Sequence, residues 1–415
     1  MTYRHTRIAA HLGMATQAVA INLPALLFVV FHDELGASTA ALGTLVAATF
    51  GVQMAVDALG ARFIDRIGYR AAALASELLS AAGLLLLPAL PALFPSRPFP
   101  AVAAALLVAA FGSGLQEVIV SPIVEALPSD RKAADMAALH ASYCWGHVAT
   151  VVLSTAWFAL FGLASWRWLP VAWAALPLAG AALFARVPIR RLLPDGETGD
   201  RPLALARSRT FALFFAMMVC GGAAEQAMSQ WASMFAQLGA GVPKAVGDLA
   251  GPLVFAVLMG SARSFFGGRG ARLDVRRAIR LSCALGVGGY LLAALGRAPA
   301  PCLAGCALCG VAAGVLWPGT LSLASRAFPR GGTALFGLLA LGGDVGCALG
   351  PAAVGWVSDA AARLFAASPG AARAASALFG EAAALPLGLK AALLAALLFP
   401  LAMRLLVRRA ASRAG

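Results

Sequence analysis

Long apolar runs recur along this chain, separated by short breaks that are polar or rich in Pro and Gly. A run of about 20 apolar residues is long enough to cross a bilayer as an α-helix. The pattern predicts an all-α polytopic membrane protein with twelve transmembrane helices. The expected spans are 8–31, 40–59, 71–91, 100–125, 135–160, 167–187, 209–236, 246–267, 277–296, 301–324, 332–359 and 384–406.

Composition agrees with this interpretation. Of 415 residues, 61% are hydrophobic and only 12% are charged, which is more apolar surface than a soluble domain needs. The N-terminal MTYRHTR leads directly into an apolar stretch without the small-residue cleavage site of a signal peptide. We therefore expect the first span to be retained.

The longest break, residues 188–208, is Pro-rich, charged and nearly central. It predicts a cytoplasmic linker between two six-helix bundles, residues 1–187 and 209–415. Compact turns bearing Gly and Arg at 61–70 and 267–274 follow the second span of each half, and weak internal symmetry of this kind is typical of transporters. We expect two pseudo-symmetric bundles with a central ligand site between them.

The net charge of +14 raises the question of nucleic-acid binding. Most of the 32 Lys and Arg residues lie at the termini and in alternate loops, a positive-inside pattern that places both termini in the cytoplasm. No basic soluble domain is evident, so we expect the lipid bilayer and not nucleic acid as the partner. The excess of Arg over Lys and the many Ala residues indicate a bacterial cytoplasmic membrane.

A polar stripe runs through the fourth span, where Ser113, Glu117 and Ser121 share one helix face. A carboxylate at this depth costs about 2.5–3.5 kcal/mol, so Glu117 is expected to face water or a partner and not lipid. Burial favours the neutral acid, which suits Glu117 to bind and release a proton during transport. The alternative is a neutral acid that hydrogen-bonds between helices for packing.

The fifth span carries a second polar face. Its residues are His140, Tyr143, Cys144 and His147, at positions i, i+3, i+4 and i+7. Imidazole and phenol groups on this face could line a cavity and recognise hydroxyls or a carboxylate. Because imidazoles titrate near neutral pH, His147 is also a candidate proton relay. The alternative is that both histidines are hydrogen-bonded packing residues.

The seventh span is the most polar of the chain. It carries Glu225, Gln226, Ser229, Gln230 and Trp231. Carboxylates, amides and an aromatic face are typical of carbohydrate sites, although Trp231 is equally suited to an anchor at the outer headgroups. Trp317 in the tenth span sits deeper and is the better candidate for stacking on a sugar.

Gly342, Gly346 and Gly350 recur every four residues in the eleventh span and predict close helix contact. Asp344 lies off this stripe and is a further candidate for binding or coupling. Acidic residues inside a membrane must be hydrated, paired or protonated. Arg263 in the eighth span is a candidate partner for one of these mid-span acids.

Asp57 and Glu77, on the second and third spans, are the remaining acids at depth. We expect them to pair with cytoplasmic-side Arg residues in a structural role.

The segment Asp65-Arg66-Ile67-Gly68-Tyr69-Arg70 resembles the signature between the second and third helices of the major facilitator superfamily, although Ala61 stands where a leading Gly is usual. Within that superfamily the chain is similar to the fucose permease branch. Further matching segments are Glu117 with Pro122, Glu225 with Trp231, Trp317-Pro318 with Ser322, and Gly350 to Asp359. The resemblance implies a twelve-helix transporter whose conformational motif is Asp65, Arg66, Gly68 and Arg70, with a coupling carboxylate at Glu117.

The first span departs from that pattern. Fucose permeases carry a second acidic residue there, whereas this chain has Gln17 and Asn22. Neutral amides can hold a sugar hydroxyl but do not exchange protons. A second titrating group would have to be Glu225 or Asp344, or else proton coupling is absent.

No Walker motif, nucleotide-binding glycine loop or HExxH site occurs, so we expect no enzymatic activity, cofactor or metal. We interpret the chain as a monomeric secondary transporter that works by alternating access. A small polar organic solute, with sugars favoured, is the expected cargo, and protons are the candidate coupling ion. The alternatives are proton-driven efflux of drug-like compounds, a membrane-embedded enzyme, and a non-transporting membrane sensor.

Overall fold

The computed structural model describes residues 1–129, 132–189, 207–269, 274–328 and 332–413. Every regular element in these residues is helical. Eleven of the described helices are long and apolar enough to cross a membrane. The chain forms two compact units, which are residues 1–37 with 48–195 (unit 1) and residues 38–47 with 196–415 (unit 2). Most of the predicted linker at 188–208 lies outside the described residues.

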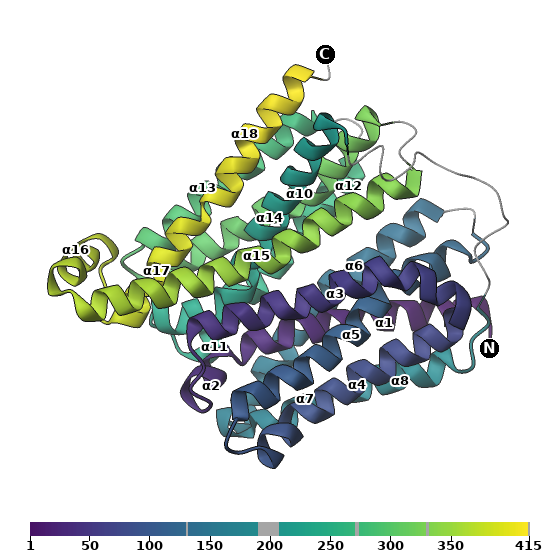
Figure 1. Ribbon diagram of the computed structural model, residues 1–415, viewed down its shortest axis with the longest axis horizontal. Helices are drawn as coiled ribbons and strands as arrows, with labels where there is room; N and C mark the ends of the chain where they lie inside the picture. The colour runs from purple at the N-terminus through teal and green to yellow at the C-terminus, as the bar shows by residue number, and fades with distance from the viewer. Residues whose placement is uncertain (130–131, 190–206, 270–273, 329–331, 414–415) are drawn as a thin grey trace. The chain divides into compact units, whose positions relative to one another are not determined.

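The helices of unit 1 cover the first six predicted spans (Figure 1). They are α1 (Tyr3–Leu26), α2 (Phe28–Asp33), α3 (Thr39–Ile67), α4 (Tyr69–Leu93), α5 (Pro98–Glu125), α6 (Lys132–Phe161), the 3₁₀ turn η1 (Leu163–Arg167), α7 (Trp168–Trp173) and α8 (Ala175–Phe184). Within this unit α5 packs along α4 and α1, and α1 also packs against α6. The first turns of α3, up to Ala47, belong to unit 2. The unit therefore brings α1, α5 and α6 together.

The first predicted span is not among the eleven helices that are long and apolar enough to cross a membrane. The polar residues His11, Gln17 and Asn22 lower its hydropathy. Pro24 lacks an N–H to continue the helix, and the span divides at Leu27 into α1 and α2. With this divided helix, the fold has the predicted twelve spans.

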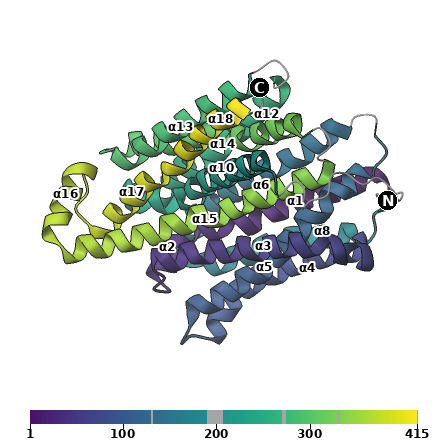
Figure 2. The ribbon, with the colours of Figure 1, turned by 45° about the horizontal axis from the view of Figure 1, so that its top comes forward.

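Unit 2 holds the remaining spans (Figures 1 and 2). Its elements are α10 (Arg209–Met234), the π-helical turn η2 (Phe235–Gly239), α11 (Lys244–Asp248), the π-helical turn η3 (Leu249–Leu253), α12 (Val254–Arg269), α13 (Val275–Leu295), α14 (Pro299–Ala327), α15 (Gly332–Ala367), α16 (Pro369–Phe379), α17 (Ala384–Ala396) and α18 (Leu398–Arg413). α10 packs along α15 and α14, and α14 packs along α12 and α13. These contacts position the polar residues of α10.

The glycine stripe of α15 packs against α10, as predicted. A Cβ atom on Gly346 would lie 2.1 Å from the carbonyl oxygen of Val219, and one on Gly350 would lie 2.4 Å from that of Ala223. Neither position has room for a side chain, because the two backbones are in contact. The close approach of α10 and α15 therefore depends on these glycines.

An extra helix, α16, was not predicted, because it is amphipathic and too short to cross a bilayer. It follows α15 and turns back beside α17 (Figures 1 and 2). Its Ala375 and Phe379 are buried with Leu387 of α17 in a small hydrophobic cluster. Lys390 of α17 is only 1% exposed, and its Nζ donates to the carbonyl oxygens of Gly296 and Phe379 at 2.8 and 3.0 Å. These contacts hold the end of α16 against α17.

Candidate functional site

The predicted carboxylate of the fourth span meets the predicted amide of the first span in unit 1. Nε2 of Gln17, on α1, donates to Oε2 of Glu117, on α5, at 2.9 Å. Gln17 is 4% exposed, whereas Glu117 is exposed although it lies in the middle of an apolar helix. The arrangement gives Glu117 a neutral hydrogen-bond donor on α1.

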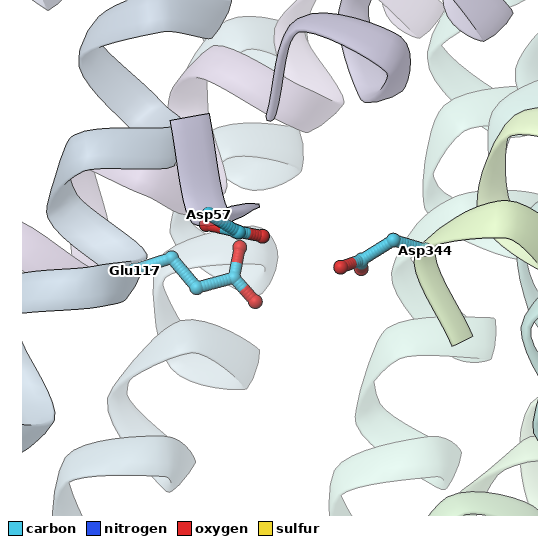
Figure 3. Close-up of side chains that lie close together, drawn as sticks. All are labelled: Asp57, Glu117 and Asp344. Carbon is cyan, nitrogen blue, oxygen red and sulfur yellow. The ribbon is translucent and has the colours of Figure 1, made fainter. Parts of the chain in front are cut away.

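A second carboxylate lies beside Glu117 in the same unit, and the sequence did not predict this proximity. Carboxylate oxygens of Asp57, on α3, and Glu117 lie within 4.8 Å of each other, and Figure 3 shows the two groups side by side. Gly114 permits the approach, because a Cβ there would lie 3.1 Å from Cα of Gln53 on α3. Nε2 of Gln53 also donates to Oγ of Ser113 at 2.9 Å. Two carboxylates this close repel each other when both are ionised.

The polar face predicted for the fifth span is divided in the structure. Nδ2 of Asn22, on α1, donates to the hydroxyl oxygen of Tyr143, on α6, at 3.3 Å, and also to the carbonyl oxygen of Ala18 at 2.8 Å. His147 is 2% exposed, whereas His140 is exposed. Tyr143 thus joins a predicted residue of α1, and the two histidines differ in exposure.

The expectation that Glu77 pairs with an Arg residue is wrong within the described part of the chain. Its side chain is fully buried on α4, and Oε1 accepts from Nε2 of Gln116, on α5, at 3.3 Å. Gly180 of α8 leaves room for the carboxyl group, since a Cβ there would lie 2.4 Å from Oε1 of Glu77. The helix rotation that directs Glu77 into the α4, α5 and α8 contact could not be inferred from its position along the sequence.

Part of the predicted conformational motif has a structural role within unit 1. Gly68 has a φ of +85°, which a glycine adopts without strain, and it precedes the first residue of α4. The guanidinium of Arg70 donates to the carbonyl oxygens of Phe184, Ala185 and Val187, at 2.8, 2.7 and 2.8 Å. Arg70 thereby caps the carboxyl end of α8. The other two motif side chains, Asp65 and Arg66, lie outside the described part of the chain.

In unit 2 the candidate partner Arg263 is paired with Glu225. Nη2 of Arg263, on α12, lies 3.0 Å from Oε2 of Glu225, on α10. The Glu225 side chain is 8% exposed and that of Arg263 is 31% exposed. This pair offers a guanidinium and a carboxylate side by side within apolar spans, a combination that binds hydroxyl or carboxylate groups.

The amides that follow Glu225 on α10 form a pair of their own. Nε2 of Gln230 donates to Oε1 of Gln226 at 3.1 Å, and both side chains are buried. Trp231 is fully buried, and its Nε1 donates to the carbonyl oxygen of Pro351 at 3.0 Å. Neither expectation for Trp231 is therefore right, because its indole packs α10 against α15.

Trp317, on α14, packs over a glycine of α15. A Cβ on Gly343 would lie 2.1 Å from the ring, so the indole occupies the space that a side chain would take. Its Nε1 is buried without a hydrogen-bond acceptor among the described residues. An unpartnered buried N–H is costly, which makes this indole a candidate donor to a solute. The neighbouring Asp344 is 7% exposed, and Figure 3 shows its carboxylate on α15.

Comparison with known structures shows what the whole chain resembles. A bacterial homolog of the human lysosomal transporter Spinster, in an inward-facing and occupied conformation, is 13% identical over 99% of this chain and 97% of that chain, with a TM-score of 0.75. The nucleoside transporter NupG is 13% identical over 98% of both chains, with a TM-score of 0.73. The Escherichia coli fucose:proton symporter FucP is 16% identical over 98% of this chain and 97% of that chain, with a TM-score of 0.60. At these identities the likeness establishes a shared fold.

No curated protein matches the sequence. The family model described as Major Facilitator Superfamily, in contrast, matches residues 10–351, which is most of the chain. The eleven apolar spans among the described residues agree with that match. This multi-pass membrane protein therefore belongs to the major facilitator superfamily of transporters.

Proposed function

We propose that this chain is a secondary transporter that moves a small polar organic solute across the bacterial cytoplasmic membrane by alternating access, with sugars as the favoured class. The observation that carries the proposal is the hydrogen bond from Gln17 to Glu117, beside Asp57, in the middle of apolar spans. A carboxylate kept at this depth indicates a binding or coupling role, because it is costly in a membrane.

The polar groups of both units suit a solute that carries hydroxyl groups. Unit 1 offers the amides of Gln17 and Asn22 with the phenol of Tyr143, and these groups both donate and accept hydrogen bonds. Unit 2 offers the amide pair of Gln226 and Gln230. We assign neither His140 nor His147 to the solute, since His140 is exposed and His147 is only 2% exposed.

Trp317 adds an aromatic ring with an N–H that no described acceptor takes. Amides with one aromatic surface are the groups that bind sugars and nucleosides, whose hydroxyls need paired donors and acceptors and whose apolar faces stack on rings. FucP carries fucose with protons and NupG carries nucleosides, according to their names. We therefore include both solute classes in the test below.

Proton coupling in this proposal runs through the two acids of unit 1. Asp57 and Glu117 are close enough that loss of their shared proton would place two negative charges within 4.8 Å. Gln17 donates to Glu117, and this hydrogen bond weakens when Glu117 is protonated, because a neutral carboxylic acid is a poorer acceptor than a carboxylate. Uptake of a proton would thus make the Gln17 amide more available to a solute hydroxyl. Asp57, and not an acid of the first span, supplies the second carboxylate.

Reconstituted liposomes with an imposed pH gradient test both parts of the proposal. The panel should contain hexoses, deoxyhexoses, nucleosides and small carboxylates. We expect gradient-driven accumulation of a hydroxyl-rich solute by the wild type. Failure of every panel member to accumulate or exchange would refute solute transport of this class.

Glu117→Gln should abolish gradient-driven accumulation while solute exchange without a gradient remains measurable. The amide has nearly the shape of the carboxyl group but cannot bind and release a proton. Asp57→Asn should behave in the same way. Glu125→Gln, at the end of the same helix α5, is the matched control and should transport as the wild type does. Unchanged accumulation in Glu117→Gln would remove this residue from the coupling role.

A further inference from the structure

A cavity of about 760 Å³ lies in unit 2, at one end of its helix bundle. Its walls come from the beginnings of α10 and α13 and from the end of α14. The volume is within the range of pockets that hold small ligands or lipid headgroups. Neither the amides nor the ion pair of α10 line this cavity, so it is separate from the candidate transport residues.

The cavity lies where three spans end. The apolar segments of α10 and α13 begin at Arg209 and Val275, and that of α14 ends at Ala327. The boundary of a membrane span corresponds to the headgroup layer. The cavity therefore lies at the level of the lipid headgroups.

The lining combines apolar and charged side chains. Phe214, Val275 and Leu323 form an apolar part, and they are 2%, 2% and 8% exposed. Arg276 and Arg326 supply two guanidinium groups to the polar part. A cavity that combines two cations with aromatic and aliphatic side chains suits an anionic amphiphile.

The only acid in the described lining, Asp274, is already engaged. Its Oδ1 accepts from the backbone N–H groups of Arg276 and Arg277 at 3.0 and 3.1 Å and caps α13. Its charge is thus directed at the helix terminus. Among the described residues, neither Arg276 nor Arg326 forms an ion pair with a carboxylate. The cavity keeps an excess of positive charge over its one acid.

We propose that this cavity binds the phosphate headgroup of an anionic phospholipid, with Arg276 and Arg326 on the phosphate and the start of an acyl chain along the partly exposed Phe328. Basic pockets between transmembrane helices bind anionic lipid headgroups in this way. Free phosphate shares the headgroup chemistry, but it would leave the apolar part of the cavity unused. This lipid site does not depend on which solute the chain carries.

The test uses the purified full-length protein in a neutral detergent. Apparent affinity is measured for dioleoyl phosphatidylglycerol, for dioleoyl phosphatidylcholine and for inorganic phosphate, by titration followed through thermal unfolding. We expect saturable stabilisation by phosphatidylglycerol at concentrations where the other two have no effect. Equal effects of both lipids, or an effect of phosphate that matches that of phosphatidylglycerol, would overturn the proposal.

Variants locate the site. Arg276→Gln with Arg326→Gln should weaken phosphatidylglycerol binding about thirtyfold, since each cation near an anionic lipid contributes about a fivefold gain. Arg277→Gln is the matched control, because Arg277 is exposed on α13 next to Arg276 but does not line the cavity, and its affinity should change less than twofold. If the double variant does not fold, each single variant should show about a fivefold loss. Full affinity in the Arg276 and Arg326 variants would place the lipid elsewhere and refute the assignment.

Discussion

The buried ion pair of unit 2 gives a quantitative test of how α10 and α12 are held together. The two charged atoms of Arg263 and Glu225 are 3.0 Å apart. With an effective dielectric constant of about 20, their attraction is about 5 kcal/mol. The Arg263 side chain is 31% exposed, so solvent screening and desolvation offset part of this energy. We expect Arg263→Gln to lower the free energy of unfolding by about 2–4 kcal/mol.

Most of that loss should come from the carboxylate left behind and not from the missing guanidinium. Glu225→Gln introduced together with Arg263→Gln should therefore restore at least about 1 kcal/mol relative to Arg263→Gln alone. The pair Asp359 and Arg363 on α15 is the control, because its charged atoms are 2.7 Å apart but the arginine side chain is 76% exposed. Arg363→Gln should cost less than about 1 kcal/mol, as exposed pairs do.

Equilibrium unfolding in mixed micelles, followed by tryptophan fluorescence and repeated on each variant, provides the measurement. If Arg263→Gln lowers the free energy of unfolding no more than Arg363→Gln does, the ion pair does not stabilise the unit as described. If the double variant is no more stable than Arg263→Gln, an unpaired buried carboxylate is not the cause of the loss.

Three further variants test individual contacts by the same unfolding measurement. Gly180→Ala should destabilise by about 1–3 kcal/mol, because the added Cβ would lie 2.4 Å from the buried Glu77 carboxyl, whereas Gly288→Ala has no atom within 4 Å and should cause no loss. Lys390→Met should cost about 3 kcal/mol, because two carbonyl oxygens and the carboxylate of Glu381 lose their donor; an unchanged midpoint would contradict this role. Arg70→Gln should cost about 1–2 kcal/mol and speed hydrogen exchange at the end of α8, and equal exchange rates would exclude the cap.

Several features of the fold could be predicted because they depend on neighbours along the chain. Hydropathy summed over about 20 residues locates a span, and a proline or a polar residue interrupts it at a defined position. The same reasoning explains why α1 is the least apolar span and why Gly346 and Gly350 mark a close helix contact. The amphipathic α16 was missed because it lies below the length that the hydropathy criterion detects.

The residue types of the candidate site were also visible in the sequence. Carboxylates and amides in apolar helices indicate candidate site residues, since each such group is costly in a membrane. Gln17, Glu117 and Glu225 were predicted as site residues on that ground alone. No partner was predicted for Glu117, and Arg263 was predicted to pair with one of several acids.

The amino-acid sequence by itself determined the spans, their breaks and which polar residues lie at membrane depth. Only the tertiary structure decided their partners, because a partner depends on the rotation of each helix about its axis and on which helices become neighbours. Gln17 and Glu117 are 100 positions apart, and Glu225 and Arg263 are 38 apart. Such distances along the chain leave no local pattern, so the pairing of Glu225 with Arg263, the proximity of Asp57 to Glu117 and the burial of Trp231 all come from helix packing.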